Sequence, residues 1–429
     1  MLHAGSELTL EIEKAVAGGR MLARHDGQVV LVSGAIPGER VLARVERTAR
    51  HLAFARVVEV LKDSPDRRAV SGDPSCGGTV FAHIGYAAQL ALKSEIVADA
   101  FVRVGRMHVD TPVPVAPSPE AGYRMRARFH VREGRFGFFR EGTHALCAPG
   151  PTGQLLPDSV TALECLATVL GHEGCSGVAA AELAENVTAS DRTIHLEVRD
   201  DLTLRKCATV TSVEGITGLT ASSIDRSDDR LVYGIPMVVD TLEFPSGRPG
   251  GASAAIRLER HTRAFFQGNR YLLSMLVNRV TACVPMGPVV DLYAGVGLFA
   301  VSLAALGWPE VVAVEGDRVS AADLHSNAKS FGARLTVAYG SVEDYLRSRR
   351  APVDATVLVD PPRTGLSTDA MAGVLGLHPA RIVYVSCDPA TLARDARMMV
   401  ERGYRLRQLE AFDLFPNTAH VESLAVFVR

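Results

Sequence analysis

The pattern of apolar and polar positions is most regular in the last third of the chain. Short apolar runs alternate there with stretches of helical periodicity, and such alternation is typical of βα units. It predicts an α/β fold with a doubly wound, mostly parallel sheet, in which ligands bind at the carboxyl ends of the strands. The runs are Val289–Leu292, Val311–Val314, Leu335–Ala338, Thr356–Val359, Ile382–Val385 and Ser423–Val428.

The N-terminal stretch has a different pattern, in which short β-branched runs are separated by glycine-containing turns. This spacing predicts a small β-barrel of the OB-like kind over residues 1–62. The runs are Leu8–Ile12, Val29–Val32, Val41–Val45 and Phe54–Val60.

Between these two regions the pattern is mixed. A polar stretch, Asp63–Pro74, reads as a linker, and helical spacing of apolar residues predicts a helix within 83–106. Strands such as Arg126–Arg132 and Ile194–Arg199 alternate with many glycines up to about residue 258. We expect a mixed α+β domain here, and its periodicity alone does not indicate a function.

Composition narrows the class of protein. The chain has 429 residues, of which 47% are hydrophobic and 22% charged, as in an ordinary globular protein of two to four domains. The net charge of −2 means that any contact with nucleic acid must come from local basic patches. No apolar run is long enough to span a bilayer, and Met1–Leu10 lacks the build of a signal peptide. Seven scattered cysteines, an odd number, favour a reducing compartment, so we expect a cytoplasmic protein.

The first strand of the βα region leads into a glycine-rich turn, Asp291–Gly297. Two glycines let the backbone approach a ligand closely, but a dinucleotide site reads similarly, with Ala300 in its third place. Asp291 at the strand end, Tyr293 within the turn and Glu315 at the end of the next strand favour S-adenosylmethionine (AdoMet), because a carboxylate at Glu315 can accept both ribose hydroxyls. The alternative is a glycine turn needed only for packing.

Asp360-Pro361-Pro362-Arg363 closes the fourth strand. Methylases that act on exocyclic amines often carry a similar turn, followed by an aromatic residue that stacks on the base. Arg363 stands in that place, which disfavours amine methylation and leaves Asp360 to hold the base or the cofactor. A proline turn that only caps the strand is the alternative.

Two further turns carry reactive side chains. Cys387, in Ser386-Cys-Asp-Pro389, follows the fifth strand. A lone cysteine is more often a small buried hydrophobe, but its place at a strand end beside the inferred AdoMet site favours a nucleophile. Phe415–Glu422 precedes the final strand and makes Glu422 a candidate base, the alternative being an exposed acid at a strand start.

A thiolate and a carboxylate beside AdoMet suit methylation of a pyrimidine carbon. Carbon 5 of uracil is a poor nucleophile, and addition of a thiolate to carbon 6 turns the ring into an enolate whose carbon 5 can attack a methyl group. A base must then remove the proton from carbon 5 so that the thiolate can leave. The target base must also leave its stack to be reached.

Taken together, these turns resemble the RNA 5-methyluridine methyltransferase family, the TRAM-domain enzymes that methylate 23S ribosomal RNA. Residues 7–62 resemble the TRAM domain more loosely, and the long Ser386–Asp395 run is the most diagnostic. The resembling stretches are Phe266–Asn269, Asp291–Gly297, Val314–Glu315, Asp360–Arg363, Ser386–Asp395 and Phe415–Glu422.

The resemblance implies a class I AdoMet methyltransferase sheet with Cys387 as the nucleophile and Glu422 as the base. It implies that Gln267, Tyr293, Glu315 and Asp360 contact the cofactor, and less securely Ser341. It also implies a division into a TRAM-like barrel over 1–62, a central domain over 63–92 and 117–258, and a catalytic domain over 93–116 and 259–429. We therefore expect a monomer that binds RNA and no membrane and methylates uridine carbon 5, in ribosomal RNA rather than transfer RNA.

Three other functions stay open: methylation of transfer RNA, methylation of cytosine in RNA, and a non-catalytic RNA-binding or RNA-folding factor that keeps the fold. No second cysteine turn of the kind used on cytosine is present, and intact Cys387 and Glu422 argue against a non-catalytic protein.

The chain departs from the family pattern at an iron–sulfur site. Many relatives bind a cluster through four cysteines, three of them upstream of a motif that here reads His83–Leu90. The matching positions are Val70, Cys76 and Thr79, and Cys147 lies near the expected fourth. Two thiolates cannot replace four, so we predict that the protein binds no iron–sulfur cluster and no other metal.

A basic group lies in the predicted barrel. Five arginines concentrate positive charge there and predict an RNA-binding surface, although a solvated polar face accounts for them equally well. They are Arg40, Arg44, Arg47, Arg50 and Arg56.

Overall fold

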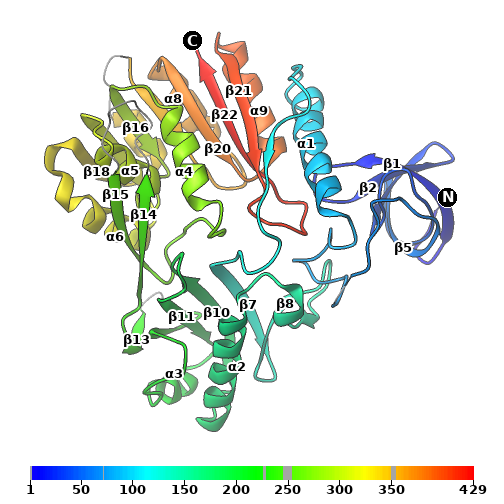
Figure 1. Ribbon diagram of the computed structural model, residues 1–429, viewed down its shortest axis with the longest axis horizontal. Coiled ribbons are helices and arrows are strands. Elements are labelled where there is room, and N and C mark those ends of the chain that lie inside the picture. The colour runs from blue at the N-terminus through cyan, green and yellow to red at the C-terminus, as the bar shows by residue number, and fades with distance from the viewer. Residues whose placement is uncertain (1, 71, 226–228, 245–253, 349–353) are drawn as a thin grey trace.

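The computed structural model describes residues 2–70, 72–225, 229–244, 254–348 and 354–429, which form three lobes (Figure 1). The N-terminal lobe is a closed five-stranded barrel with the strand order β1-β2-β3-β5-β4, as the sequence predicted. In β1 alternate residues are buried, which places Leu8, Leu10 and Ile12 inside the barrel. The strands are β1 Glu7–Ala15, β2 Met21–His25, β3 Gln28–Ser33, β4 Arg40–Ala49 and β5 Leu52–Lys62.

The central lobe is built on a seven-stranded sheet with the order β13-β12-β11-β10-β7-β8-β9. Helices α2 (Pro157–His172) and α3 (Asp201–Cys207) contribute to an apolar core on one face of this sheet, around Phe129 and Leu196. The strands are β7 Arg126–Arg132, β8 Arg135–Phe139, β9 Leu146–Cys147, β10 Val178–Glu185, β11 Arg192–Val198, β12 Gly218–Ser223 and β13 Arg230–Gly234, and a 3-10 turn, η1, spans Gly150–Thr152.

The largest lobe carries an eight-stranded sheet with the order β18-β17-β16-β19-β20-β22-β21-β6. Strands β16 to β20 are parallel, and β22 runs antiparallel to β20. This confirms the predicted doubly wound sheet. The strands are β6 Val115–Ala116, β16 Pro288–Leu292, β17 Glu310–Glu315, β18 Leu335–Tyr339, β19 Thr356–Val359, β20 Arg381–Ser386, β21 Arg405–Phe412 and β22 Glu422–Val428.

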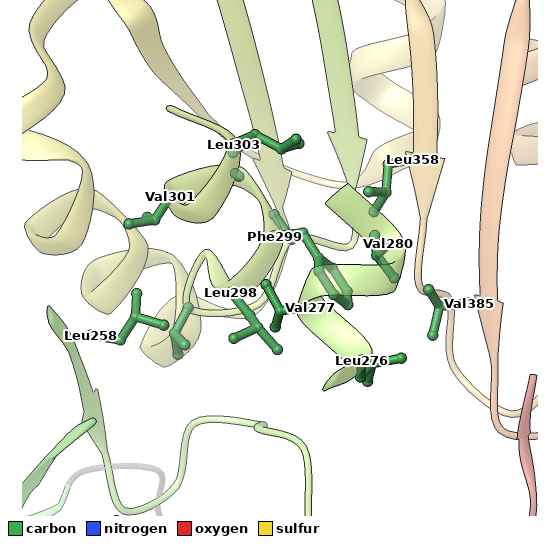
Figure 2. Packing of buried hydrophobic residues seen from close by; sticks show 14 of the residues in the cluster. Leu258, Leu276, Val277, Val280, Leu298, Phe299, Val301, Leu303, Leu358 and Val385 are labelled. Carbon is green, nitrogen blue, oxygen red and sulfur yellow. The ribbon is translucent and has the colours of Figure 1, made fainter. Parts of the chain in front are cut away.

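Two apolar cores lie in this lobe, one built around helices α4 and α5 and the other around α1, α8 and α9. Figure 2 shows the first core, where Val277 and Val280 of α4 and Phe299 of α5 pack near Leu358 and Val385 of the sheet. The helices are α1 Tyr86–Arg103, α4 Leu273–Ala282, α5 Leu298–Ala305, α6 Arg318–Ala328, α7 Val342–Ser348, α8 Thr368–Gly376 and α9 Pro389–Glu401, with a 3-10 stretch η2 over Lys329–Arg334.

Several segments from outside the last third of the chain belong to this lobe. Helix α1 packs against α9, and β6 extends the sheet by pairing with β21. A hairpin of β14 (Met237–Phe244) and β15 (Ala254–His261) packs against α4, α5 and α6, so the predicted boundary at residue 258 lies within β15. The division of the chain into domains stays a prediction.

Within the described ranges, no helix combines the length and the apolar character that crossing a bilayer requires.

Candidate active site

The turn after β16 has the backbone conformation that its glycines require. Tyr293, Gly295 and Gly297 all have positive φ, at 62°, 57° and 96°. A Cβ on Gly297 would lie 2.7 Å from the side chain of Leu324 and 2.9 Å from that of Val301, so any other residue here requires these side chains to shift. Glu315 holds the turn from the next strand, because its carboxylate accepts hydrogen bonds from Gly295 N at 2.7 Å and Asp317 N at 2.6 Å.

Four of the five predicted cofactor residues gather around this turn. Gln267, Tyr293 and Asp360 line one cleft together with Gly295 and Phe299. The Gln267 amide donates to Asp360 at 3.1 Å, and Glu315 reaches the cleft through its bond to Gly295. Burial raises the pKa of Asp360 to about 7, although the bond from Gln267 opposes the shift.

Asp291 is a buried acid two residues before Tyr293 of this cleft. It is fully buried, and neither carboxylate oxygen has a hydrogen bond of normal geometry in the described part of the chain, although the backbone N–H of Ala300 is close enough to lower its pKa. Burial, and then the charge of Asp360, raise the pKa of Asp291 well above its usual value. A cluster of carboxyl groups around a glycine cradle fits a ligand that carries positive charge, as AdoMet does on its ammonium and sulfonium groups.

Ser341, the fifth predicted cofactor residue, has a local structural role. Its hydroxyl bonds to the Asp344 carboxylate at 2.7 Å and accepts from Asp344 N at 3.1 Å, which caps the start of α7. The neighbouring Gly340 N donates to Glu315 O, so Ser341 stands near the end of β17. Its role toward the cofactor stays a prediction.

Cys387 and Glu422 meet across two antiparallel strands. Ser386 of β20 pairs with Ser423 of β22, and one further step in this register places Cys387 opposite Glu422. The two side chains interact electrostatically, and both also interact with Asp360 at the cofactor cleft. The two candidate catalytic groups are therefore brought together beside the candidate AdoMet site.

The protonation of these two groups is set by their enclosure. Burial raises the pKa of the Cys387 thiol to about 11, with a further increase from the charge of Glu422 and an opposing effect of Arg363. Glu422 is 4% exposed, and burial, followed by the charge of Asp360, raises the pKa of its carboxyl well above its usual value. A carboxylate with a raised pKa is a stronger proton acceptor, as a general base requires.

A cavity of about 600 Å³ opens in front of Cys387. The barrel contributes Gly18, Gly19 and Arg56 to its wall, and the segment before β22 contributes His420. Desolvation by the cavity wall and the charges of Arg363 and Lys93 lower the pKa of His420, although the residue is still exposed to solvent. The cavity can admit a substrate that is held by the barrel and the catalytic lobe together.

The sequence predicted no role for Arg363. It showed only that the aromatic residue found at this place in amine methylases is missing. The structure shows that its positive charge acts on Cys387, Glu422 and His420 alike. The Asp360–Arg363 turn could have predicted this role. An arginine at a strand end that also carries several acidic residues offsets their negative charge.

The predicted iron–sulfur positions contain a disulfide. Cys76 and Cys147 are bonded, with their Cα atoms 5.8 Å apart, beside a cavity of about 200 Å³. Thr79 directs its hydroxyl to the carbonyl oxygens of Asp73 and Cys76. Two cysteines bonded to each other do not fit a cluster that needs four thiolates, and no group of three or more potential ligands is assembled among the described residues.

This pair corrects the inference drawn from the spacing of the cysteines. They are scattered in sequence, but two that are 71 residues apart lie together in space. Their scatter is therefore no argument for a reducing compartment. The cytoplasmic location and the absence of a cluster both stay predictions.

The barrel arginines differ in how far their charge is neutralised. Arg44 pairs with Glu7 at 2.8 Å, Arg56 with Glu46 at 2.9 Å, and Arg40 with Glu11 at 3.5 Å. By contrast, the Arg47 guanidinium lies 3.4 Å from the centroid of the Phe54 ring, and Arg50 is exposed in the β4–β5 turn. These two are the better candidates for binding phosphate.

The fold and this site define an AdoMet-dependent methyltransferase joined to a small closed β-barrel. Comparison with family models supports both parts: the TRAM domain matches residues 3–58, and the family described as tRNA (Uracil-5-)-methyltransferase matches residues 252–429. The chain belongs to the AdoMet-dependent RNA uracil-C5 methyltransferase family.

Individual relatives agree over nearly the full length. A 23S rRNA (uracil(1939)-C(5))-methyltransferase of Pseudomonas putida is 33% identical over 99% of this chain and 94% of its own length. An uncharacterized RNA methyltransferase of Thermotoga maritima is 31% identical over 98% of both chains. The Pyrococcus abyssi tRNA (uracil-54, C5)-methyltransferase, solved with S-adenosyl-L-homocysteine, covers 98% of this chain and 100% of its own at a TM-score of 0.73 and 23% identity, which shows a shared fold.

Proposed function

We propose that this enzyme methylates carbon 5 of a uridine in 23S ribosomal RNA through a covalent bond between Cys387 and carbon 6 of the base, with Glu422 removing the proton from carbon 5. The observation that carries the proposal is the strand register that sets Cys387 opposite Glu422 next to the candidate AdoMet cleft.

Each step has a group in place. The Cys387 thiol first loses its proton to water in the cavity. The thiolate sulfur then bonds to carbon 6, and the electron pair of the carbon 5–carbon 6 double bond moves into an enolate. Carbon 5 takes up the methyl group that AdoMet supplies. The Glu422 carboxylate then accepts the proton of carbon 5, the double bond re-forms, and the electron pair of the carbon–sulfur bond returns to Cys387.

The charges around Cys387 act in opposite directions on the formation of its thiolate. Its raised pKa keeps it protonated before RNA arrives. Arg363 is the positive group that favours the thiolate, while Glu422 and Asp360 oppose it.

Trapping with a fluorinated base tests the nucleophile. A fluorine on carbon 5 cannot leave as a proton does, so RNA containing 5-fluorouridine should form a denaturant-resistant complex with the enzyme. Cys387→Ala should abolish this complex, whereas Cys165→Ala, at another partly exposed cysteine, should leave it intact. A complex that persists in Cys387→Ala would assign the nucleophile to another residue.

The role of Glu422 as the base is tested by the rate at which the methylated RNA is released. Glu422→Gln should still form the bond to carbon 6 and transfer the methyl group, but release should slow by about 10²- to 10⁴-fold, the usual contribution of a general base. Methylated complex should then accumulate on unmodified RNA. Glu401→Gln, on the outer surface of α9, serves as the control. Normal release by Glu422→Gln would mean that another group takes the proton.

The choice of 23S ribosomal RNA rests on the relatives that match the chain over its whole length and carry that name. A transfer RNA substrate is the second candidate, because the matching family is described by that activity. Mapping 5-methyluridine in both RNAs from a deletion strain decides between them: loss of a single site in 23S RNA supports the proposal, and loss from transfer RNA overturns it.

A further inference from the structure

The segment that leads into Glu422 is the place where the lobes of the molecule meet. It comprises residues 413–421 between β21 and β22, here called the base loop. A Cβ on Gly19 of the barrel would lie only 2.5 Å from the Cβ of Ala419, so the barrel closes directly on this loop. The central lobe reaches it through the Tyr123 hydroxyl, which donates to Pro416 O at 3.3 Å.

One face of α1 holds the base loop from the other side. Tyr86, Gln89 and Lys93 stand three and four residues apart, so they lie on the same face of the helix. Lys93 forms an ion pair with Asp413, with both side chains fully buried, and donates to Phe415 O at 3.1 Å. Tyr86 also interacts with the Asp413 carboxylate.

Gln89 contacts the loop at its tightest turn. Its amide nitrogen donates to the Asn417 side-chain oxygen at 2.9 Å, and its amide oxygen accepts from Asn417 N at 2.9 Å. The same nitrogen is within bonding distance of Phe81 O and Ile84 O, at 3.2 and 3.0 Å. Gln89 is fully buried, so nothing in water can replace these bonds.

The contacts of Tyr86, Gln89 and Lys93 with the base loop, here called the clamp, hold a turn of the backbone in place. Asn417 has a φ of 63°, in the left-handed region, which asparagine adopts more readily than most residues other than glycine. Three residues further on stands His420 in the wall of the cavity, and Glu422 follows it. The position of both side chains therefore depends on how Asn417 is held.

We propose that Gln89 is a positioning residue for proton removal: its two-way bond to Asn417 fixes the base loop and thereby orients the Glu422 carboxylate, which the β20–β22 register places opposite Cys387. The inference rests on the proposed covalent mechanism. It gives a role to the His83–Leu90 motif, which in the sequence served only as a marker beside the iron–sulfur positions.

The clamp should act on one step, because Cys387 is held independently. Its turn is fixed by Asp388, whose carboxylate caps α9 by accepting from Ala390 N and Thr391 N at 2.9 and 2.8 Å. None of these bonds involves the base loop. A displaced loop therefore moves Glu422 and leaves the nucleophile where it was.

The test compares two rates in the full-length enzyme: methyl transfer from labelled AdoMet to RNA in a single turnover, and decay of the methylated covalent complex. In Gln89→Met, decay should slow by about tenfold or more, since small displacements of a catalytic group cost up to about 10²-fold, while methyl transfer stays within about twofold. Gln408→Met on the exposed side of β21 is the matched control and should change neither rate.

Asn417→Gly provides a second variant, because glycine adopts the left-handed conformation but lacks the side-chain oxygen that accepts from Gln89 and also from Arg68. It should slow decay in the same selective way. The slowing in the double variant should be smaller than the product of the two single effects, because both changes remove the same bond between the two side chains.

The inference is supported if decay of the methylated complex, but not methyl transfer, slows in either single variant and if the effects of the two changes do not add in the double variant. Unchanged decay in both, or an equal loss of both rates, overturns it even if the wild-type enzyme forms its complex normally. If the wild-type enzyme forms no covalent complex with fluorinated RNA, the covalent mechanism itself fails. If Gln89→Met does not fold, Asn417→Gly decides alone.

Discussion

At the scale of single residues, the site combines four acidic side chains with one thiol and one arginine. Three of the acids, Asp291, Asp360 and Glu422, have pKa values raised chiefly by burial. Such clustering is unfavourable for folding alone, because each charge is removed from water and repelled by its neighbours. A positively charged methyl donor and the proton of carbon 5 are the partners that would relieve it.

The alkylation rate of Cys387 should rise with pH, and the charges of Glu422 and Arg363 should shift the pH at which it rises. Its pKa of about 11 lies above neutral pH, so the thiolate fraction rises about tenfold per pH unit below that value. Removing the negative neighbour in Glu422→Gln should lower this pKa and increase alkylation by iodoacetamide at pH 8. Removing the positive neighbour in Arg363→Gln should raise the pKa and decrease alkylation.

Peptide-resolved mass spectrometry of the RNA-free protein would measure these rates, with the partly exposed Cys165 as the internal reference. Equal alkylation of Cys387 in all three proteins would show that neither neighbour acts on the thiol.

At the scale of elements, the decisive feature is that side chains collect at the carboxyl edge of the large sheet. The ends of β16, β17, β19 and β20 deliver Asp291, Glu315, Asp360 and Cys387 to this edge. The antiparallel strand β22 starts where the parallel strands end, and for that reason it can bring Glu422 to the same place. A parallel last strand would begin at the opposite edge and carry its first residue away from the cysteine.

The turn after β16 allows a test of the close approach between α5 and α6. Gly297→Ala would put a Cβ 2.7 Å from Leu324, in addition to the strain of a positive φ. Gly307 has a similar φ of 98°, but a Cβ there meets nothing within 4 Å, so Gly307→Ala measures the strain alone. We expect Gly297→Ala to lose about 1–3 kcal/mol more unfolding free energy, as overpacked sites do, and to bind AdoMet more weakly.

Denaturant unfolding and AdoMet titration of both variants would check this. Equal losses of stability would mean that α6 moves aside at little cost.

At the scale of the whole molecule, the barrel and the catalytic lobe share the cavity in front of Cys387. Two ion pairs link the barrel to the central lobe: Arg20 pairs with Glu141 at 3.2 Å, and Arg56 approaches the same carboxylate at 4.0 Å. The arginines that make such pairs hold the lobes together, and this leaves fewer of them for RNA.

RNA binding by the barrel should therefore depend on particular arginines. Replacing Arg47 and Arg50 by glutamine should reduce the dependence of RNA affinity on salt by about 0.7 to 0.9 for each phosphate that the variant no longer neutralises. The same change at Arg40 and Arg44, which pair with Glu11 and Glu7, should have a smaller effect. Filter binding at several salt concentrations measures both. If RNA affinity depended on salt in the same way in all variants, these barrel arginines would not contact RNA phosphates.

The predicted absence of an iron–sulfur cluster also has consequences for the whole protein. The Cys76–Cys147 bond joins the segment after the barrel to the edge of the central sheet at β9. We expect the protein to purify from anaerobic cells without stoichiometric iron and sulfide, and to unfold at the same temperature with and without a chelator. Stoichiometric iron and sulfide would mean that distant cysteines complete a site.

The sequence by itself determined the kind of sheet, the barrel and the turns that carry chemistry. It did so because β-branched runs, glycine turns and strand-end motifs are local features, written within a few residues of each other. It did not predict β2, because Met21, Leu22 and Ala23 are all buried and the strand therefore lacks an alternation of apolar and polar residues. It also missed β21, because Arg405–Phe412 mix polar and apolar residues without a regular alternation of burial.

Only the tertiary structure decided which distant residues meet. The opposition of Cys387 and Glu422 depends on an antiparallel pairing that no local pattern encodes. The contact of Gln89 with Asn417, 328 residues away, and the bond of Cys76 to Cys147 depend on how the lobes pack. The physical reason is the same in each case: periodicity reports which face of an element is buried, whereas the partner of that face is selected by the fit of the whole chain.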